Sequence, residues 1–167
     1  MFLWFIGGSI ALVWVVFHST RLDYRLIALG AVLPGLEAVT GHDGILHTLV
    51  APIAVLVVVM AATRRRRTAR RRWLCVPIGM FCHLVLDGVW TRKEWFWWPA
   101  FGTNFPDLPS LVVDRGLVVD LGLEVAGLAV LIWAWRRFEL ADPERRRRLL
   151  TTGTLDPALA RGPEAGM

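Results

Sequence analysis

Four long apolar stretches stand out in the pattern of hydrophobic and polar positions along the chain. They cover residues 2–17, 45–62, 73–90 and 117–135. A helix that crosses a bilayer needs roughly 17–25 apolar residues, so the pattern predicts four membrane-spanning helices, of which the first is marginal in length. No Lys or Arg precedes the first stretch and no small-x-small cleavage site follows it, which favours an uncleaved span over a signal peptide.

A weaker apolar segment covers residues 26–39 and is interrupted by Gly30, Pro34 and Gly35. It is too short and too broken to cross the bilayer, so we expect a re-entrant or interfacial segment. The predicted fold class is therefore all-α: a polytopic membrane helical bundle with about four transmembrane helices plus this re-entrant or interfacial segment. Residues 1–138 would form the membrane domain.

The remaining residues, 139–167, are predicted to form a basic cytoplasmic tail that contains the sequence ADPERRRRLL. Asp142 suits a helix N-cap, Pro143 suits the first turn, and Glu144 favours the positive end of the helix dipole. We therefore expect a short basic helix on the anionic inner leaflet, followed by a disordered end of about a dozen residues rich in Pro, Gly and Ala.

Composition and charge indicate a membrane protein whose basic residues set its orientation. The 167-residue chain is 55% hydrophobic, with a mean hydropathy of +0.49 and a formal net charge of +5. Its Arg runs, at 64–72, 136–137 and 145–148, abut apolar segments, so they indicate topology rather than nucleic-acid binding. By the positive-inside rule these runs are cytoplasmic in a plasma or inner membrane, which predicts two cytoplasmic termini and outward loops at 18–44 and 91–116.

Aromatic residues gather in and beside the second outward loop. Trp90, Trp95, Trp97 and Trp98 fit an aromatic belt at the level of the lipid headgroups, and a substrate-contacting lip is the alternative interpretation. The two cysteines, seven residues apart in the third apolar stretch, match no zinc or redox spacing and are expected to be small core residues.

Ionisable residues outside the Arg runs are distributed unevenly along the chain. All four histidines and most of the acids fall outside the predicted cytoplasmic half. They are His18, His42, His47, His83, Asp23, Glu37, Asp43, Asp87, Asp114, Asp120 and Glu124. Since an ionisable group at mid-membrane costs at least about 2.5–3.5 kcal/mol on insertion scales, such groups are usually paired, hydrated or bound to a metal.

His83 and Asp87 form the sharpest pair, because side chains at i and i+4 project from one face of a helix. An imidazole nitrogen and a carboxylate oxygen at this spacing can both bind one divalent metal ion. The alternative is an Asp that accepts a hydrogen bond from its own His, as a ligand orienter or as a satisfied polar pair. His47 is predicted to lie near the same outer level.

A second pair at i and i+4, Asp120 and Glu124, lies on the fourth apolar stretch. Glu124 is about two turns inside the expected helix, where an unpaired carboxylate would be protonated or would need a partner. The structural interpretation pairs this acid with an arginine such as Arg115 or Arg92.

The order of these motifs resembles a known family. The sequences LGAVLPGLE, HDGILHTL, CHLVLDGVW and WFWWP, within roughly residues 23–102, are similar to the YdjM-like membrane-bound metal-dependent hydrolases. The matching positions are Pro34 in a Leu-Pro-Asp-x-Asp turn, His42, His47 and Thr48 in a His-x-x-x-x-His-Ser/Thr stretch, and His83 and Asp87 in a Ser-His-x-x-x-Asp motif. The chain departs from the pattern at the turn, where it has Gly35 and Glu37 and so lacks one potential ligand. All-helical zinc phospholipase C enzymes are more distantly similar.

The resemblance implies a metal-dependent hydrolase that acts at the outer face on a lipid-borne phosphoester or another ester. The metal ligands in this hypothesis are His47, His83 and Asp87, with Glu37 or Asp23 completing the shell of a divalent ion, expected to be zinc. The residues expected to act as general base or to orient a ligand are Glu124 and Asp120.

Two other functions stay open. The chain could be a non-enzymatic membrane scaffold or partner-binding protein, in which the polar cluster is a hydrogen-bond network between helices. It could also form an ion or proton path, but such a path needs polar groups in the cytoplasmic half, where few are visible. The bilayer is the expected partner in every case, no nucleic acid is expected, and the pattern specifies no oligomeric state.

Overall fold

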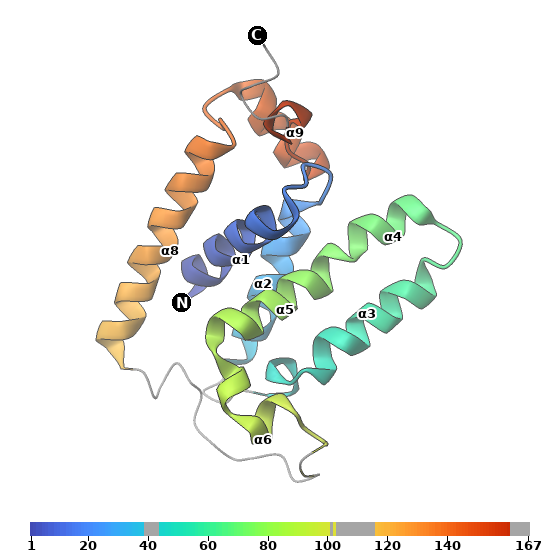
Figure 1. The fold of residues 1–167 in the computed structure, drawn as a ribbon, viewed down its shortest axis with the longest axis vertical. Helices are drawn as coiled ribbons and strands as arrows, with labels where there is room; N and C mark the ends of the chain where they lie inside the picture. The colour runs from blue at the N-terminus through green and yellow to red at the C-terminus, as the bar shows by residue number, and fades with distance from the viewer. Residues whose placement is uncertain (39–43, 101, 103–115, 161–167) are drawn as a thin grey trace.

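The computed structural model describes residues 1–38, 44–100, 102 and 116–160, and every regular element within these ranges is a helix. The all-α prediction is therefore confirmed for this part of the chain. The α-helices are α1 (Phe2–Phe17), α2 (Tyr24–Ala38), α3 (Val50–Ala62), α4 (Arg67–Trp73), α5 (Cys75–Asp87), α6 (Lys93–Phe96), α8 (Leu117–Arg137) and α9 (Pro143–Thr152). Short 3-10 turns are η1 (Ile45–His47), η2 (Val89–Thr91) and η3 (Pro157–Ala160). Helices α1, α2 and α5 lie between α8 on one side and α3 on the other (Figure 1).

Helices α2 and α5 run parallel and make the most extensive helix contact in the described residues. Their backbones approach closely because glycines face each other at the crossing. A Cβ on Gly30 would overlap the carbonyl oxygen of Val76, and a Cβ on Gly79 would overlap the carbonyl oxygen of Ile27. Small residues at such crossings let helices pack without the side chains that would keep them apart.

The segment predicted to be re-entrant or interfacial, 26–39, is not broken in its described part, residues 26–38. This part belongs to α2, an uninterrupted helix that lies along α5 from Asp23, whose amide contacts the Cys75 thiol at 3.3 Å, to Ala31, beside His83. Pro34 sits inside this helix. The glycines that suggested a break allow close helix packing instead. The described bundle therefore contains one more packed helix than the sequence predicted.

Helices α1 and α8 run parallel, again through a glycine contact. A Cβ on Gly7 would lie 2.8 Å from the carbonyl oxygen of Gly127. At one end the amino group of Met1 lies 3.0 Å from the Glu124 carboxylate, and at the other Arg137 lies 5.3 Å above the Trp14 ring.

These contacts place Met1 and the Arg runs at opposite ends of the bundle. Met1 lies beside Glu124, far from the Arg runs, whereas Asp23 pairs with Arg72 at 3.0 Å, at the end where the Arg runs gather. The prediction of two cytoplasmic termini with an outward loop at 18–44 is not confirmed, because Asp23 lies at the Arg-rich end of the bundle and Met1 lies at the other end.

Only α8, among the described helices, is long and apolar enough to cross a membrane by length and composition. The apolar helices α1 and α3 are shorter, with 16 and 13 residues. At 1.5 Å per residue α3 is about 20 Å long, less than a hydrocarbon core of about 30 Å. The predicted count of four full spans is not supported.

The C-terminal segment folds back onto the bundle. Helix α9 begins as predicted: the Asp142 side chain accepts a hydrogen bond from the Glu144 amide, and Pro143 occupies the first turn. Leu155 and Leu159 are buried in the cluster that contains Tyr24 and Phe138. The predicted disorder is therefore wrong up to residue 160, and residues 161–167 lie outside the described part.

The predicted aromatic belt is supported only in part by exposure. Trp90 and Trp97 are exposed, but Trp95 is fully buried against Leu84 and Val89.

Both cysteines are buried and have free thiols, as the sequence predicted.

We expect Gly79→Ala to destabilise the bundle by about 1–3 kcal/mol, since the added methyl group must push apart two packed backbones. Gly122→Ala is the matched control, because nothing lies within 4 Å of a Cβ at this helical glycine. The control should be neutral or more stable by up to about 1 kcal/mol, from helix propensity alone. Thermal unfolding in detergent measures both, and an equal effect of the two variants would contradict the packing described.

Candidate metal centre

His83 lies on α5 with its side chain buried and its ring fixed by a backbone group of α2. The Nδ1 atom is 2.6 Å from the carbonyl oxygen of Ala31. A carbonyl oxygen only accepts, so Nδ1 donates its hydrogen and the lone pair of the neutral ring is on Nε2. This arrangement is common for metal-binding histidines, whose second nitrogen usually donates to a carbonyl or a carboxylate.

The ring of His83 is also held in its plane by an aromatic neighbour from α1. Phe5 stacks on it with ring centroids 3.8 Å apart and planes inclined by 26°. On the α2 side, a Cβ on Gly35 would lie 3.6 Å from the His83 Cε1 atom. The imidazole is therefore held between α1 and α2 in one orientation.

His47 ends the η1 turn and is likewise buried. Its Nδ1 atom lies 3.4 Å from the Oε2 atom of Glu37. The same oxygen accepts hydrogen bonds from the amides of Gly44 at 3.0 Å and Leu46 at 2.9 Å. An ionised carboxylate can only accept, so it holds Nδ1–H of His47 and leaves the lone pair of the neutral ring on Nε2.

Three buried polar side chains converge in this region. One ligand atom from each of His47, His83 and Asp87 can be chosen so that all lie within 4.8 Å of one another. The two imidazole rings meet edge to face, with centroids 5.4 Å apart. Two imidazole nitrogens and one carboxylate oxygen are a donor set that zinc uses in proteins.

Glu37 is close to this cluster. Its Oε2 atom contacts the turn before α3 and the ring of His47.

Asp23 does not reach the cluster. It lies before the other end of α2, where Arg25 and Arg72 bind its carboxylate at 3.1 and 3.0 Å. Burial raises the pKa of Asp23, but the hydrogen bond and charge of Arg25, together with the charge of Arg72, outweigh it and hold the pKa below its usual value.

The two acids predicted to be catalytic lie on α8. Glu124 binds the amino group of Met1 at 3.0 Å and accepts from the Leu3 amide at 2.9 Å, so it holds the start of α1. Asp120, one turn earlier, is partly buried, and its Oδ1 atom has no hydrogen-bond partner among the described residues. Of the other residues named from the sequence, His18 is exposed at the far end of α1, whereas His42, Asp43, Asp114 and Arg115 lie outside the described part.

The sequence did not reveal two groups that shape the centre, the Ala31 carbonyl and the Phe5 ring. A backbone carbonyl leaves no mark in a sequence pattern, but Gly30 and Gly79 could have indicated that α2 and α5 come close enough for such a bond. Phe5 is one of many apolar residues in its stretch, and only the fold distinguishes it.

Comparison with known proteins gives one positive finding. The model of the family described as YdjM inner membrane protein matches residues 4–143. No curated protein matches the chain, and no solved structure does.

We expect Asp23→Asn to loosen the C-terminal segment, because Arg25 binds both Asp23 and the carbonyls of Leu150 and Thr151 that end α9. The loss should be about 1–3 kcal/mol at pH 7 and should speed tryptic cleavage at residues 145–148. Since the folded pKa of Asp23 is lowered, its contribution is complete above about pH 4–5 and is lost as the pH falls through the folded pKa.

The difference in thermal midpoint between wild type and variant should therefore shrink on acidification. Glu94→Gln, at an exposed acid on α6, is the control. A difference that stays constant from pH 7 to pH 3 would contradict an ionised Asp23.

Proposed function

Because the chain belongs to the YdjM inner membrane protein family, we propose that it is a membrane-embedded, metal-dependent hydrolase centred on His47, His83 and Asp87. One observation carries the proposal. Three buried groups with the donor atoms of a zinc site converge within 4.8 Å, and both histidines present the nitrogen opposite an oriented Nδ1.

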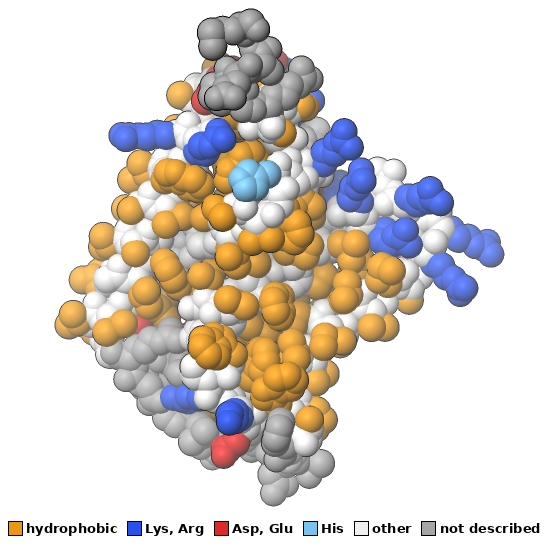
Figure 2. Space-filling model, viewed as in Figure 1, with side chains coloured by type: hydrophobic (Ala, Val, Ile, Leu, Met, Phe, Trp, Pro, Cys, Tyr) orange, Lys and Arg blue, Asp and Glu red, His pale blue; other side chains and the backbone are white. Residues whose placement is uncertain are grey.

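The bundle would lie in the membrane with its Arg-rich end in the cytoplasm. The supporting observations are the family and the apolar surface, since many large side chains on α1, α3 and α8 are exposed. Figure 2 shows hydrophobic side chains across the middle of one face, with most Lys and Arg side chains gathered beyond them. Helices α4 and α5 follow each other with only Leu74 between, so together they extend about 31 Å, the thickness of a hydrocarbon core.

In this placement the centre lies in the non-cytoplasmic half. His83 follows Arg72 by 11 residues along α4 and α5, a rise of about 16 Å. Shorter helices such as α3 would be accommodated by local thinning of the bilayer and by long Arg side chains that reach the interface.

A divalent ion held there would act as a Lewis acid on an ester or phosphoester and would activate water for hydrolysis. The chain's own residues would do the rest. Glu37 and the Ala31 carbonyl orient the two imidazoles, Asp87 supplies negative charge, and Phe5 keeps one side of the centre apolar. The proposal gives no catalytic role to Glu124, because its carboxylate holds the start of α1.

A lipid-borne ester or phosphoester suits this location as substrate, because the centre is buried in an apolar bundle. A soluble substrate would have to leave water in order to reach it. A non-enzymatic scaffold remains the second candidate. The scaffold function is favoured by the contacts of Glu37, whose Oε2 atom lies within hydrogen-bond distance of Gly44, Leu46 and His47. Such contacts are typical of a structural network between helices.

We expect the detergent-purified protein to contain about one equivalent of zinc or manganese, measured by elemental analysis. His83→Ala and Asp87→Asn should lose the metal, because each removes one of the three converging ligands. His18→Ala, which removes an exposed histidine, should keep it. If the wild type contains no metal even after zinc is supplied, and the folded variants contain none either, the result would support the scaffold.

Glu37→Gln tests the role given to this carboxylate. An amide can still accept hydrogen bonds but carries no charge, so the imidazole of His47 should become less basic and less well oriented. We expect zinc affinity to fall about 10–100-fold while the site remains, measured by competition with a chelator. Complete loss of binding would instead make Glu37 a ligand, and unchanged affinity would remove it from the centre.

A further inference from the structure

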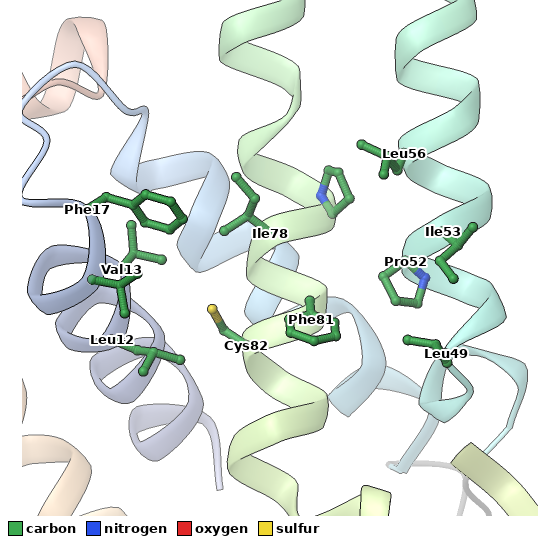
Figure 3. Close-up of a pocket in the computed structure, with 12 residues that line it drawn as sticks. Leu12, Val13, Phe17, Leu49, Pro52, Ile53, Leu56, Ile78, Phe81 and Cys82 are labelled. Carbon is green, nitrogen blue, oxygen red and sulfur yellow. The ribbon is translucent and has the colours of Figure 1, made fainter. Parts of the chain in front are cut away.

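An apolar groove lies between α1, α3 and α5 on the flank of the bundle. Its volume is about 540 Å³, within the range of ligand sites, and its lining is almost entirely hydrocarbon. Figure 3 shows Val13 and Phe17 of α1 facing Ile53 and Leu56 of α3 across Ile78 of α5. The groove is open at the side, where the surrounding medium would be lipid.

A basic pocket adjoins the groove at its Arg-rich end. This second cavity, of about 510 Å³, is lined by Leu22, Arg67, Thr68, Arg70, Arg71, Leu74 and Ile78. Ile78 lines both cavities, so the apolar groove and the arginine-lined pocket are neighbours on α5. None of the lining residues is acidic. The cavity beside α9 differs, because Asp142, Glu144 and Asp156 stand among its arginines.

Both cavities follow one face of the nearly continuous α4 and α5. Arg70, Leu74, Ile78 and Cys82 succeed one another at intervals of four residues, so they lie along one side of the helix pair. From Arg70 to Cys82 the rise is about 18 Å, slightly more than one leaflet of a hydrocarbon core of about 30 Å. The face therefore joins positive charge at the membrane surface to an apolar track within the leaflet.

We propose that this face binds an anionic phospholipid of the cytoplasmic leaflet, with its phosphate among Arg67, Arg70 and Arg71 and one acyl chain in the groove. Guanidinium groups match phosphate oxygens in charge and geometry. Basic pockets between membrane helices on the cytoplasmic side suit such headgroups, and the groove accounts for the chain. The site is separate from the His47–His83–Asp87 cluster and goes beyond the proposed hydrolase function.

The test measures lipid affinity with two charge-matched double variants of the full chain in a neutral detergent. Arg70→Gln with Arg71→Gln removes two charges from the pocket. Arg64→Gln with Arg65→Gln removes two from the same basic loop but none from the lining. Phosphatidylglycerol should raise the thermal midpoint of wild type more than phosphatidylcholine does. The pocket variant should need about ten-fold more phosphatidylglycerol for the same shift, and the control should behave as wild type.

A second pair of variants tests the groove. Ile53→Trp fills it, and Val125→Trp places the same ring on the exposed face of α8. The first should weaken binding of phosphatidylglycerol and the second should not. Inorganic phosphate alone should give no shift, since it lacks the chain.

The proposal is overturned if both double Arg variants lose affinity equally, which would show general attraction only. It is also overturned if Ile53→Trp binds as wild type, or if phosphatidylcholine or inorganic phosphate stabilises as well as phosphatidylglycerol. His83→Ala should leave the lipid shift intact, so failure of the metal proposal does not affect this result.

Discussion

The close crossing of α2 and α5 is the contact on which the rest of the structure depends. With no side chain at Gly30 or Gly79, two backbones come within reach of each other's polar groups. One result is the 2.6 Å hydrogen bond from His83 to the Ala31 carbonyl, which needs α2 to lie directly on α5. Another is the register that puts Asp23 beside Cys75 and Arg72 at the opposite end. In lipid, where apolar surface gains little by meeting other apolar surface, close packing and buried hydrogen bonds are what remain to hold helices together.

The polar cluster suits such a bundle because each of the two histidine rings has a hydrogen-bond acceptor within the chain. The Ala31 carbonyl fixes the tautomer of His83, and Glu37 fixes that of His47. In both histidines Nδ1 is thereby the oriented nitrogen, which is common among metal-binding histidines. Two of the acids outside the cluster make structural contacts: Glu124 holds the start of α1, and Asp23 pairs with Arg25 of α2 and Arg72 of α4.

Much of the helix content could be predicted from the sequence, because apolar runs and caps are local signals. The first apolar stretch coincides with α1, the helix after Asp142 begins as its cap indicated, and His83 with Asp87 share a face of α5. The segment 26–39 was misjudged since glycine and proline indicate a break by local rules, whereas tertiary packing makes glycine useful inside a helix. The sequence also did not indicate that Asp23 lies at the Arg-rich end of the bundle, away from Met1. Sequence spacing alone could not show that Glu37 contacts His47, because the two residues lie on different elements.

We propose above all that two imidazoles and one carboxylate from η1 and α5 surround one ion inside the bundle. X-ray absorption spectroscopy of the zinc-loaded protein tests it most directly, because the spectrum reports the atoms that contact the metal. We predict nitrogen and oxygen neighbours at about 2.0–2.2 Å, with the multiple-scattering signature of two imidazoles. Sulfur neighbours at about 2.3 Å, which would come from Cys75 or Cys82, would contradict the claim, as would a shell of oxygen atoms with no imidazole signature.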